Sequence, residues 1–183
     1  MNIVETGIAD LVVIEPRVFA DDRGYFFESF NRQSWPDHIA HTEFVQDNEA
    51  YSSKGVLRGL HYQVSPFAQA KLVRVVQGEV LDVVVDIRPD SKTYGQVFSE
   101  VLSGANKKQM YVPRGFAHGY LVLSETAIFS YKCDNYYSKE HEGGVFFNDD
   151  KLKIDWQFDL SKVELSEKDK YLPMFGDHRP FTL

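Results

Sequence analysis

Short β-like runs separated by turn signals dominate this chain of 183 residues and constrain its fold more than any other feature. Runs rich in Val, Ile, Phe and Tyr are typical of strands, and almost no stretch has helical periodicity. The expected strands are 11–15, 25–30, 44–48, 56–63, 71–77, 79–87, 96–102, 109–112, 119–123 and 127–133. Many short strands at this spacing predict a single all-β domain over residues 1–183, a sandwich or barrel of the jelly-roll type.

The segments between these runs carry their own signals. The Gln77-Gly78 pair predicts a β-hairpin that joins 71–77 to 79–87. The polar stretch 49–54 is expected to be a loop, and 31–35 is expected to form one helical turn. Residues 165–169 have the pattern of a capped helical turn, so we expect only a few short helices.

Charge and composition exclude several classes of protein. The net charge of -7 argues against broad binding of nucleic acid or anionic membranes, although a few convergent cations could still hold a small anion. No apolar run approaches membrane-spanning length, and the first residues lack the pattern of a signal peptide. Cys133 is the only cysteine, which excludes an intrachain disulfide. We therefore expect a cytoplasmic protein that binds neither nucleic acid nor membranes.

Residues 55–63, Gly-Val-Leu-Arg-Gly-Leu-His-Tyr-Gln, place one cation and one titratable ring in an apolar run. Strict alternation along a strand would put Arg58 and His61 on opposite faces. Glycine inside a strand often marks a bulge or bend. An irregularity at Gly59 would therefore bring the two side chains onto one face.

Two segments together resemble the paired motifs of the cupin superfamily, a double-stranded β-helix (jelly-roll) barrel. The first is 55–63 and the second is 113–118, Pro-Arg-Gly-Phe-Ala-His. Metal-binding cupins carry His-x-His and Glu in the first motif, whereas Gln63 replaces the second histidine here and no glutamate follows before Glu79. Two histidines and an amide are a poor ligand set for Zn or Fe. We expect a barrel without a metal.

Further blocks along the chain resemble the dTDP-4-dehydrorhamnose 3,5-epimerase family. They are residues 23–28, 44–48, 55–63, 71–74, 78–86, 115–119, 131–132, 135–137 and 165–169. The resemblance runs in order from Ile3 to Asp169. It implies an isomerase that converts dTDP-4-dehydro-6-deoxy-D-glucose to dTDP-4-dehydro-L-rhamnose, on the route to dTDP-L-rhamnose, by moving protons at carbons 3 and 5. It implies no cofactor, since the ketone already acidifies both carbons.

The resemblance also implies catalytic roles. His61 would be the base and Tyr131 the acid on the far side of the sugar ring. Lys71 would stabilise the enolate oxygen, because an ammonium is most effective where negative charge develops in a dry pocket. Asp169 would orient His61 and support its protonated form.

The family's binding positions match further residues. The resemblance implies that Arg23, Arg58 and Lys168 contact the nucleotide or its diphosphate, that Glu28, Gln46, Asp47 and Asn48 surround the thymidine, and that His118 and Glu142 also bind substrate. In the family the N-terminal strands cross to the partner subunit. The resemblance thus implies a homodimer with exchanged strands, in which Arg23 and Glu28 serve the neighbour's site.

Three alternatives stay open at the level of sequence. One is a single-carbon epimerase of another dTDP-4-keto-deoxysugar, which the same residues would serve. Another is a non-catalytic jelly roll that binds sugar nucleotides, which would not need His61, Tyr131 and Asp169 together. The third is a metal-dependent cupin dioxygenase. On their own, Lys168 and Asp169 could be solvated charges, and both assigned roles depend on the tail folding back over the barrel.

Overall fold

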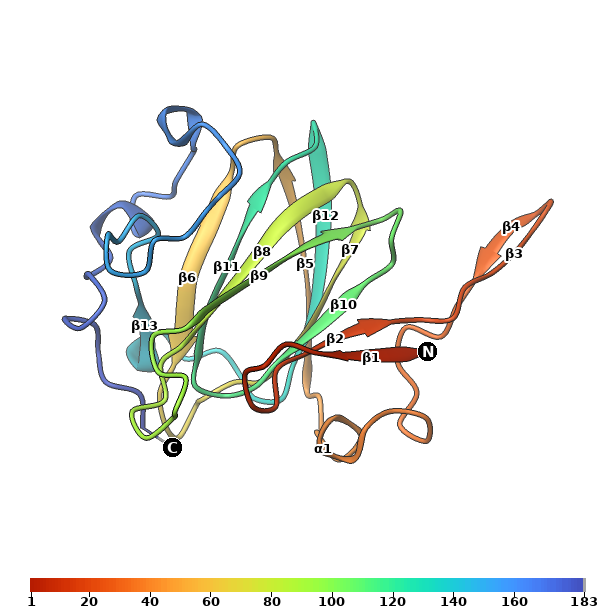
Figure 1. The fold of residues 1–183 in the computed structure, drawn as a ribbon, viewed down its shortest axis with the longest axis horizontal. Helices are drawn as coiled ribbons and strands as arrows, with labels where there is room; N and C mark the ends of the chain where they lie inside the picture. The colour runs from red at the N-terminus through yellow and green to blue at the C-terminus, as the bar shows by residue number, and fades with distance from the viewer. Residues whose placement is uncertain (183) are drawn as a thin grey trace.

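The computed structural model describes residues 1–182, apart from the side chain of His38, as two facing antiparallel sheets with a small hairpin outside them (Figure 1). The six-stranded sheet contains, in spatial order, β1 (Asn2–Glu5), β2 (Val12–Glu15), β10 (Gln109–Val112), β7 (Lys71–Gln77), β12 (Thr126–Cys133) and β5 (Gln46–Ser53). The five-stranded sheet contains β13 (Glu142–Gly144), β6 (Leu57–Gln63), β11 (Phe116–Val122), β8 (Glu79–Asp86) and β9 (Val97–Ser103). The expected all-β jelly-roll architecture is confirmed.

Helices are few and short, as expected. They are α1 (Asp37–Ala40) and the 3-10 helices η1 (Lys139–His141), η2 (Leu160–Lys162) and η3 (Asp169–Tyr171). Within residues 1–182, no helix is both long and apolar enough to cross a lipid bilayer.

Strand β8 is buried over almost its whole length because the five-stranded sheet packs on both faces. On the inner face, Val80 and Val84 pack in one cluster with Val73 of the opposing sheet. On the outer face, Leu81 packs in another cluster with Trp156 of the C-terminal tail. Burying one such side chain contributes about 1.5–3 kcal/mol. This packing holds the tail against the sheet and brings η3 next to β6.

The predicted hairpin between 71–77 and 79–87 is wrong. β7 belongs to the six-stranded sheet and β8 to the five-stranded sheet, so the chain changes sheets at Gly78. Gly78 has φ +80, and a Cβ there would lie 2.0 Å from the Thr126 carbonyl oxygen. A tight crossing between two layers and a hairpin turn require the same residue types, because both need a positive φ and close backbone approach.

Three other local expectations differ from the structure. Residues 49–53 of the expected loop belong to β5, an edge strand in which Glu49 and Ser53 are exposed and Ser52 is buried. The strand expected at 25–30 ends at Phe26. The helical turn expected at 31–35 is a hydrogen-bonded turn over 32–34, in which the Ser34 amide donates to the Asn31 carbonyl, and not a helix. The helix α1 begins after Pro36, whose carbonyl accepts hydrogen bonds from the first turn.

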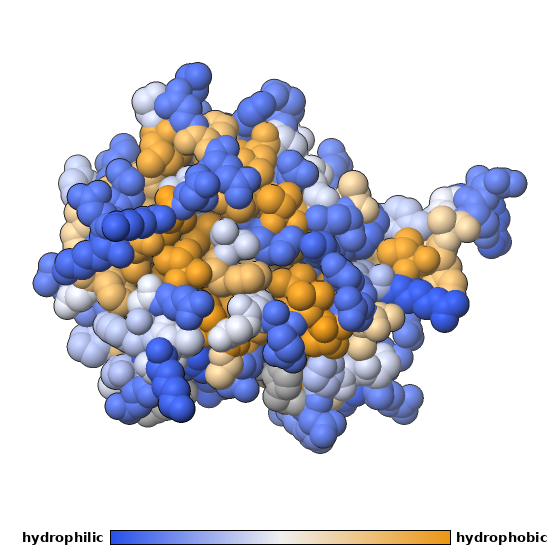
Figure 2. All heavy atoms as spheres, viewed as in Figure 1, coloured by the Kyte–Doolittle hydropathy of each residue, from blue (hydrophilic) through white to orange (hydrophobic). Residues whose placement is uncertain are grey.

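The hairpin of β3 (Phe19–Asp21) and β4 (Gly24–Phe26) stands away from both sheets, at the right of Figure 1. We call residues 18–28 the arm. It exposes large side chains, with Phe19 50% and Phe26 65% accessible. Figure 2 shows apolar atoms along the arm and a hydrophilic tip. A two-stranded hairpin is marginally stable on its own, so this arm lacks the packing that the rest of the chain has.

Candidate active site

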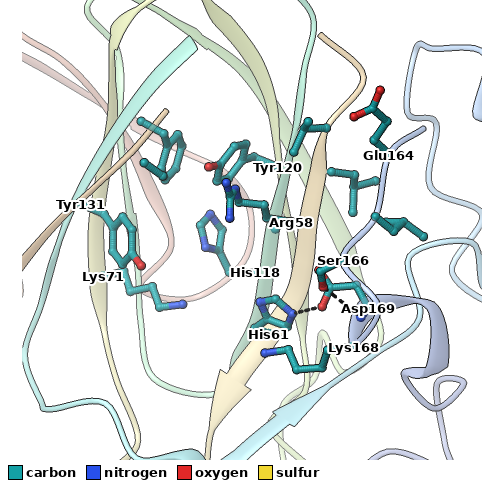
Figure 3. A pocket seen from close by; sticks show the side chains of 16 residues that line it. Arg58, His61, Lys71, His118, Tyr120, Tyr131, Glu164, Ser166, Lys168 and Asp169 are labelled. Atoms are coloured by element: carbon teal, nitrogen blue, oxygen red, sulfur yellow. Dashed lines mark hydrogen bonds and ion pairs between the residues drawn. The ribbon is translucent and has the colours of Figure 1, made fainter. Parts of the chain in front are cut away.

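A cavity of about 490 Å³ opens between the two sheets. Its polar and aromatic lining residues come from four strands and the tail: Arg58 and His61 on β6, His118 and Tyr120 on β11, Phe129 and Tyr131 on β12, Lys71 on β7, and Glu164, Ser166, Lys168 and Asp169 on the tail (Figure 3). A second cavity of about 320 Å³ shares His61, Lys71 and Tyr131 with the first. The two cavities therefore meet at these three side chains.

The local shape of β6 explains why Arg58 and His61 line the same cavity. Gly59 has φ +138, and the pairing of β6 with β11 shifts register at this point. A Cβ on Gly59 would lie only 2.5 Å from the Gly119 Cα, so a larger residue would not fit. The expected irregularity at Gly59 is confirmed, and it overrides the strict alternation of the strand.

His61 is hydrogen-bonded to a buried carboxylate from the tail. Its Nε2 lies 2.6 Å from Asp169 Oδ1, and the Gly59 amide lies 3.4 Å from Asp169 Oδ2. Burial alone would raise the pKa of Asp169, but the hydrogen bond and charge of His61, with the Gly59 amide and Lys168, hold that pKa below its usual value. Asp169 is thus ionised at neutral pH, and His61 Nδ1 has no protein partner among the described residues.

Tyr131 and Lys71 approach the cavity from the opposite sheet (Figure 3). Burial, with Cys133 and Tyr120 nearby, raises the pKa of Tyr131 to about 12, so its phenol keeps its proton at neutral pH. Lys71 Nζ lies 5.9 Å from the centroid of the Tyr131 ring. Burial also lowers the pKa of Lys71, and no carboxylate in the described chain forms an ion pair with it.

A second histidine–aspartate pair lies deeper. His118 Nε2 is 2.9 Å from Asp82 Oδ1 and 3.0 Å from Oδ2. Burial raises the pKa of Asp82, with His118 acting in the opposite direction. Sequence reasoning did not single out Asp82. The sequence did contain a sign of it: Asp82 lies in a strand between Val80 and Val84, and all three side chains share the face that points into the barrel.

Comparison with known proteins agrees with this arrangement. A family model described as dTDP-4-dehydrorhamnose 3,5-epimerase matches residues 5–177. The chain belongs to the dTDP-4-dehydrorhamnose 3,5-epimerase family. It is 50% identical over 173 residues to the dTDP-4-dehydrorhamnose 3,5-epimerase of Escherichia coli, an alignment that covers 94% of this chain and 93% of that protein.

Solved structures of the same epimerase family have the same fold. The dTDP-4-dehydrorhamnose 3,5-epimerase of Elizabethkingia anophelis is 53% identical, covers 97% of each chain and superposes with a TM-score of 0.91. The Legionella pneumophila enzyme, in complex with dTDP-4-keto-L-rhamnose, is 45% identical with a TM-score of 0.93 and covers 100% of this chain and 98% of that one.

The polar residues expected around the nucleotide of an epimerase from this family divide between two faces of β5. Gln46 and Asn48 point inward, line the second cavity, and are joined by a hydrogen bond of 3.0 Å. Asp47 points outward, is 69% exposed, and forms an ion pair of 2.8 Å with Lys132. Alternation along the strand explains the split, so the structure does not bring Asp47 to either cavity.

Two further predicted residues meet at the mouth of the site. Glu142 on β13 lines the second cavity, and its Oε1 lies 2.6 Å from Lys168 Nζ. Lys168 belongs to the tail and lines the first cavity. The tail does fold back over the barrel, as the assignment of Lys168 and Asp169 required.

The two predicted residues of the arm lie apart from this cavity. Arg23 is 90% exposed and is 2.5 Å from Asp21 Oδ2 in an ion pair. Glu28 accepts a hydrogen bond of 2.9 Å from Asn31. Neither lines the cavities of its own chain that contain His61. The cavities of a single chain therefore do not include the two residues that the sequence analysis assigned to a neighbour's site.

Gln63, which stands where metal-binding cupins carry a second histidine, forms hydrogen bonds to two loops. Gln63 Nε2 donates to the Phe67 carbonyl at 2.6 Å, and Gln63 Oε1 accepts from the Ser138 amide at 2.7 Å. Across the residues that the structure describes, no group of three or more His, Cys, Asp or Glu side chains is arranged to hold a metal ion. The amide of Gln63 thus ties two loops together below the cavity.

Proposed function

We propose that this chain is a cofactor-independent epimerase that converts dTDP-4-dehydro-6-deoxy-D-glucose to dTDP-4-dehydro-L-rhamnose. The observation that carries the proposal is the position of two opposed groups in one cavity. His61, paired with an ionised carboxylate, projects from one sheet, and a protonated Tyr131 projects from the other. Inversion at carbon needs a base and an acid on opposite sides of the ring, and this cavity offers both.

The proposed reaction uses three side chains in sequence. His61 Nδ1 takes the proton from a carbon next to the ketone, and the electrons of that C–H bond move into an enolate. The Asp169 carboxylate stabilises the imidazolium, while the Lys71 ammonium stabilises the enolate oxygen. Tyr131 then gives its phenolic proton to the opposite face of the carbon and recovers one from solvent, while the imidazolium of His61 releases its proton to solvent and becomes a base again. The same cycle acts at carbons 5 and 3.

Two properties of the cavity support this order of events. The raised pKa of Tyr131 keeps the phenol protonated until a strongly basic enolate carbon is present. Lys71 has no ion-pair partner among the described residues, and Cys133, Asp82 and Glu142 oppose the lowering of its pKa by burial, so its ammonium is available to the enolate oxygen. General acid–base groups placed in this way contribute roughly 10²- to 10⁴-fold each.

We also propose that the protein is a cytoplasmic homodimer of one-domain subunits that exchange their arms. The exposed aromatic side chains of the arm support this, because a partner's surface would bury Phe19 and Phe26. Pairing would carry Arg23 and Glu28 to the neighbour's cavity. A buried, unpaired Cys133 fits a reducing compartment.

Deuterium uptake tests the proposed reaction. In heavy water, the wild-type protein is expected to place deuterium at carbons 3 and 5 of the dTDP-ketosugar, detected by mass spectrometry or NMR. Tyr131→Phe removes the acid and keeps the base, so it is expected to retain exchange at the first carbon and to lose inverted product by about 10²-fold. A reductase that traps the product reports which carbons have inverted.

Two outcomes would count against the proposal. Folded protein that binds substrate to saturation and incorporates no deuterium would remove epimerisation altogether. Uptake at one carbon only, with a singly inverted product after trapping, would replace the two-carbon reaction with single-carbon epimerisation.

A further inference from the structure

The hydroxyl of Tyr120 is an exception in the interior of this protein. Tyr120 is 5% exposed, and its Oη is the one buried side-chain nitrogen or oxygen among the described residues that makes no hydrogen bond of regular geometry. Burial raises the pKa of Tyr120, and the nearby Arg58 and Ser52 side chains oppose that rise, so these two side chains are polar neighbours of the hydroxyl. Buried polar side-chain atoms in native proteins are paired in the large majority of cases. This hydroxyl lies on the wall of the cavity that contains His61, so a ligand could pair with it.

The packing around Tyr120 fixes the direction of its hydroxyl. Its ring stacks on Phe129, with centroids 4.1 Å apart and planes 16° from parallel. Across the β6–β11 pair, Tyr120 is the direct partner of Arg58, and Figure 3 shows the Tyr120 oxygen turned toward the Arg58 guanidinium. The buried Ser52 on β5 holds the same guanidinium, since Arg58 Nε donates to Ser52 Oγ at 3.1 Å.

These three side chains form a cluster of donors with a positive charge. No carboxylate in the described part of the chain pairs with Arg58, so its terminal nitrogens are available to a ligand. The Tyr120 hydroxyl can donate as well, while the Ser52 oxygen already accepts from Arg58. A hydroxyl donor beside a guanidinium that has no carboxylate partner is suited to bind the oxygens of an anion, and above all those of a phosphate.

The register of the sheet relates this cluster to the catalytic groups. His118 is the partner of His61, and Tyr120 is the partner of Arg58. Two residues along a strand span roughly 7 Å, which is comparable with the breadth of a sugar ring. A sugar held against His61 would therefore present the group on its anomeric oxygen to Tyr120 and Arg58.

We propose that the Tyr120 hydroxyl donates a hydrogen bond to a diphosphate oxygen of the substrate and forms, with Arg58 and Ser52, one subsite for the diphosphate. This inference rests on the proposed function for the substrate class. The inference adds one contact to the diphosphate, a hydrogen bond from the hydroxyl of Tyr120.

Isothermal titration with dTDP and with thymidine tests the subsite on the intact protein. Tyr120→Phe keeps the ring and its stacking on Phe129 and removes only the hydroxyl. It is expected to weaken dTDP binding by about 10-fold, the usual loss for a hydrogen bond to a charged group, and to leave thymidine binding unchanged. Its ligand-free melting temperature should fall by less than that of a variant that loses a hydrogen bond of regular geometry, because the Tyr120 hydroxyl has only its contacts with Ser52 and Arg58 to lose.

Tyr111→Phe is the matched control. Tyr111 is also buried, 7% exposed, and its hydroxyl is 3.1 Å from Thr42 Oγ1, away from the catalytic cavity. It is expected to lower the melting temperature by about 2–4 °C and to leave dTDP affinity unchanged. Tyr120→Phe and Tyr111→Phe should therefore show opposite patterns of stability and binding.

Inorganic pyrophosphate separates this inference from the proposed function. If the wild type fails to bind dTDP but binds pyrophosphate in a manner that Tyr120→Phe weakens, the subsite stands and the nucleotide substrate is wrong. Equal dTDP affinity in wild type and Tyr120→Phe would overturn the subsite while leaving the epimerase proposal intact. A Tyr120→Phe protein with a markedly lower melting temperature and normal dTDP affinity would also overturn the subsite. Failure of both ligands to bind the wild type would overturn both proposals.

Discussion

Two histidine–aspartate pairs lie side by side in this protein, and their surroundings differ. His61 is 25% exposed at its side chain, and its partner Asp169 is 3% exposed. The corresponding values for His118 and Asp82 are 7% and 0%. The two histidines are register partners on adjacent strands, so the same chemical pair occurs twice on one sheet. Both histidines line the cavity, but only His61 is appreciably exposed in it.

The carboxylates also differ in their protonation. Asp169 has His61, the Gly59 amide and the charge of Lys168 to favour its ionised form, and its pKa lies below the usual value. Asp82 is fully enclosed, and burial raises its pKa. A carboxylate that stays ionised beside an accessible imidazole suits proton abstraction, whereas an enclosed pair suits the positioning of neighbouring side chains. The comparison therefore supports the proposal that His61, and not His118, is the base.

Alanine at each histidine gives the largest expected contrast. His61→Ala removes the proposed base and is expected to lower the rate of deuterium exchange by about 10³-fold. It also leaves the Asp169 carboxylate without its partner, so some unfolding free energy is lost as well. His118→Ala leaves Asp82 buried without its donor, which should cost about 3–5 kcal/mol of unfolding free energy, and should retain more exchange than His61→Ala.

Exchange rates and urea unfolding of both variants, measured where each is folded, check this contrast. A folded His118→Ala protein with exchange as low as that of His61→Ala would contradict the division of roles between the two pairs.

Removing the charge from the accessible pair should have the next largest effect. Asp169→Asn keeps the shape of the side chain and removes the ion that stabilises protonated His61. We expect kcat to fall by about 10- to 100-fold, the value of a hydrogen bond to a charged group, with a smaller change in KM. Steady-state kinetics with Asp82→Asn as the control measure this effect. A kcat loss for Asp82→Asn that equals or exceeds the loss for Asp169→Asn would refute the comparison.

The smallest expected effect is the pH dependence of stability, which should have opposite signs for the two aspartates. The lowered pKa of Asp169 means that its carboxylate stabilises the fold above the unfolded value of about 3.9, and that this contribution is lost as pH falls through the folded pKa. The raised pKa of Asp82 means that stability is lost as pH rises from about 3.9 through its folded pKa.

Urea unfolding of the two asparagine variants as a function of pH measures these slopes. Relative to wild type, Asp169→Asn should be less stable at neutral pH by about 1 kcal/mol and should converge with wild type in acid. Asp82→Asn should gain relative stability as pH rises. Slopes of the same sign would show that the two carboxylates share one environment.

Much of this site could be read from the sequence because its residues lie in short motifs. The strand 56–63 was recognisable from its apolar run, and Gly59 marked the irregularity that aligns Arg58 with His61. The family resemblance led to Asp169, and the 165–169 segment had to fold back for the pair to form. That contact joins residues far apart in the chain, so periodicity alone could not establish it.

Other features depend on which layer a strand joins, and local patterns do not contain that information. Gly78 has the signature of a hairpin, yet the chain crosses there between sheets. Asp47 and Asn48 are neighbours in a polar block, and the pleat of β5 sends them to opposite faces. The role of Asp82 became visible only when His118 was placed beside it.

Because Asp169 belongs to the tail, the activity of the protein depends on whether the tail is intact. The strands that line the cavity end before residue 145, whereas the carboxylate that pairs with the His61 imidazole and further lining residues come from the tail. Loss of the tail would leave the strands with a more open cavity and a base without its carboxylate. Damage to the tail would then abolish the activity of the protein and would not produce an enzyme of altered specificity.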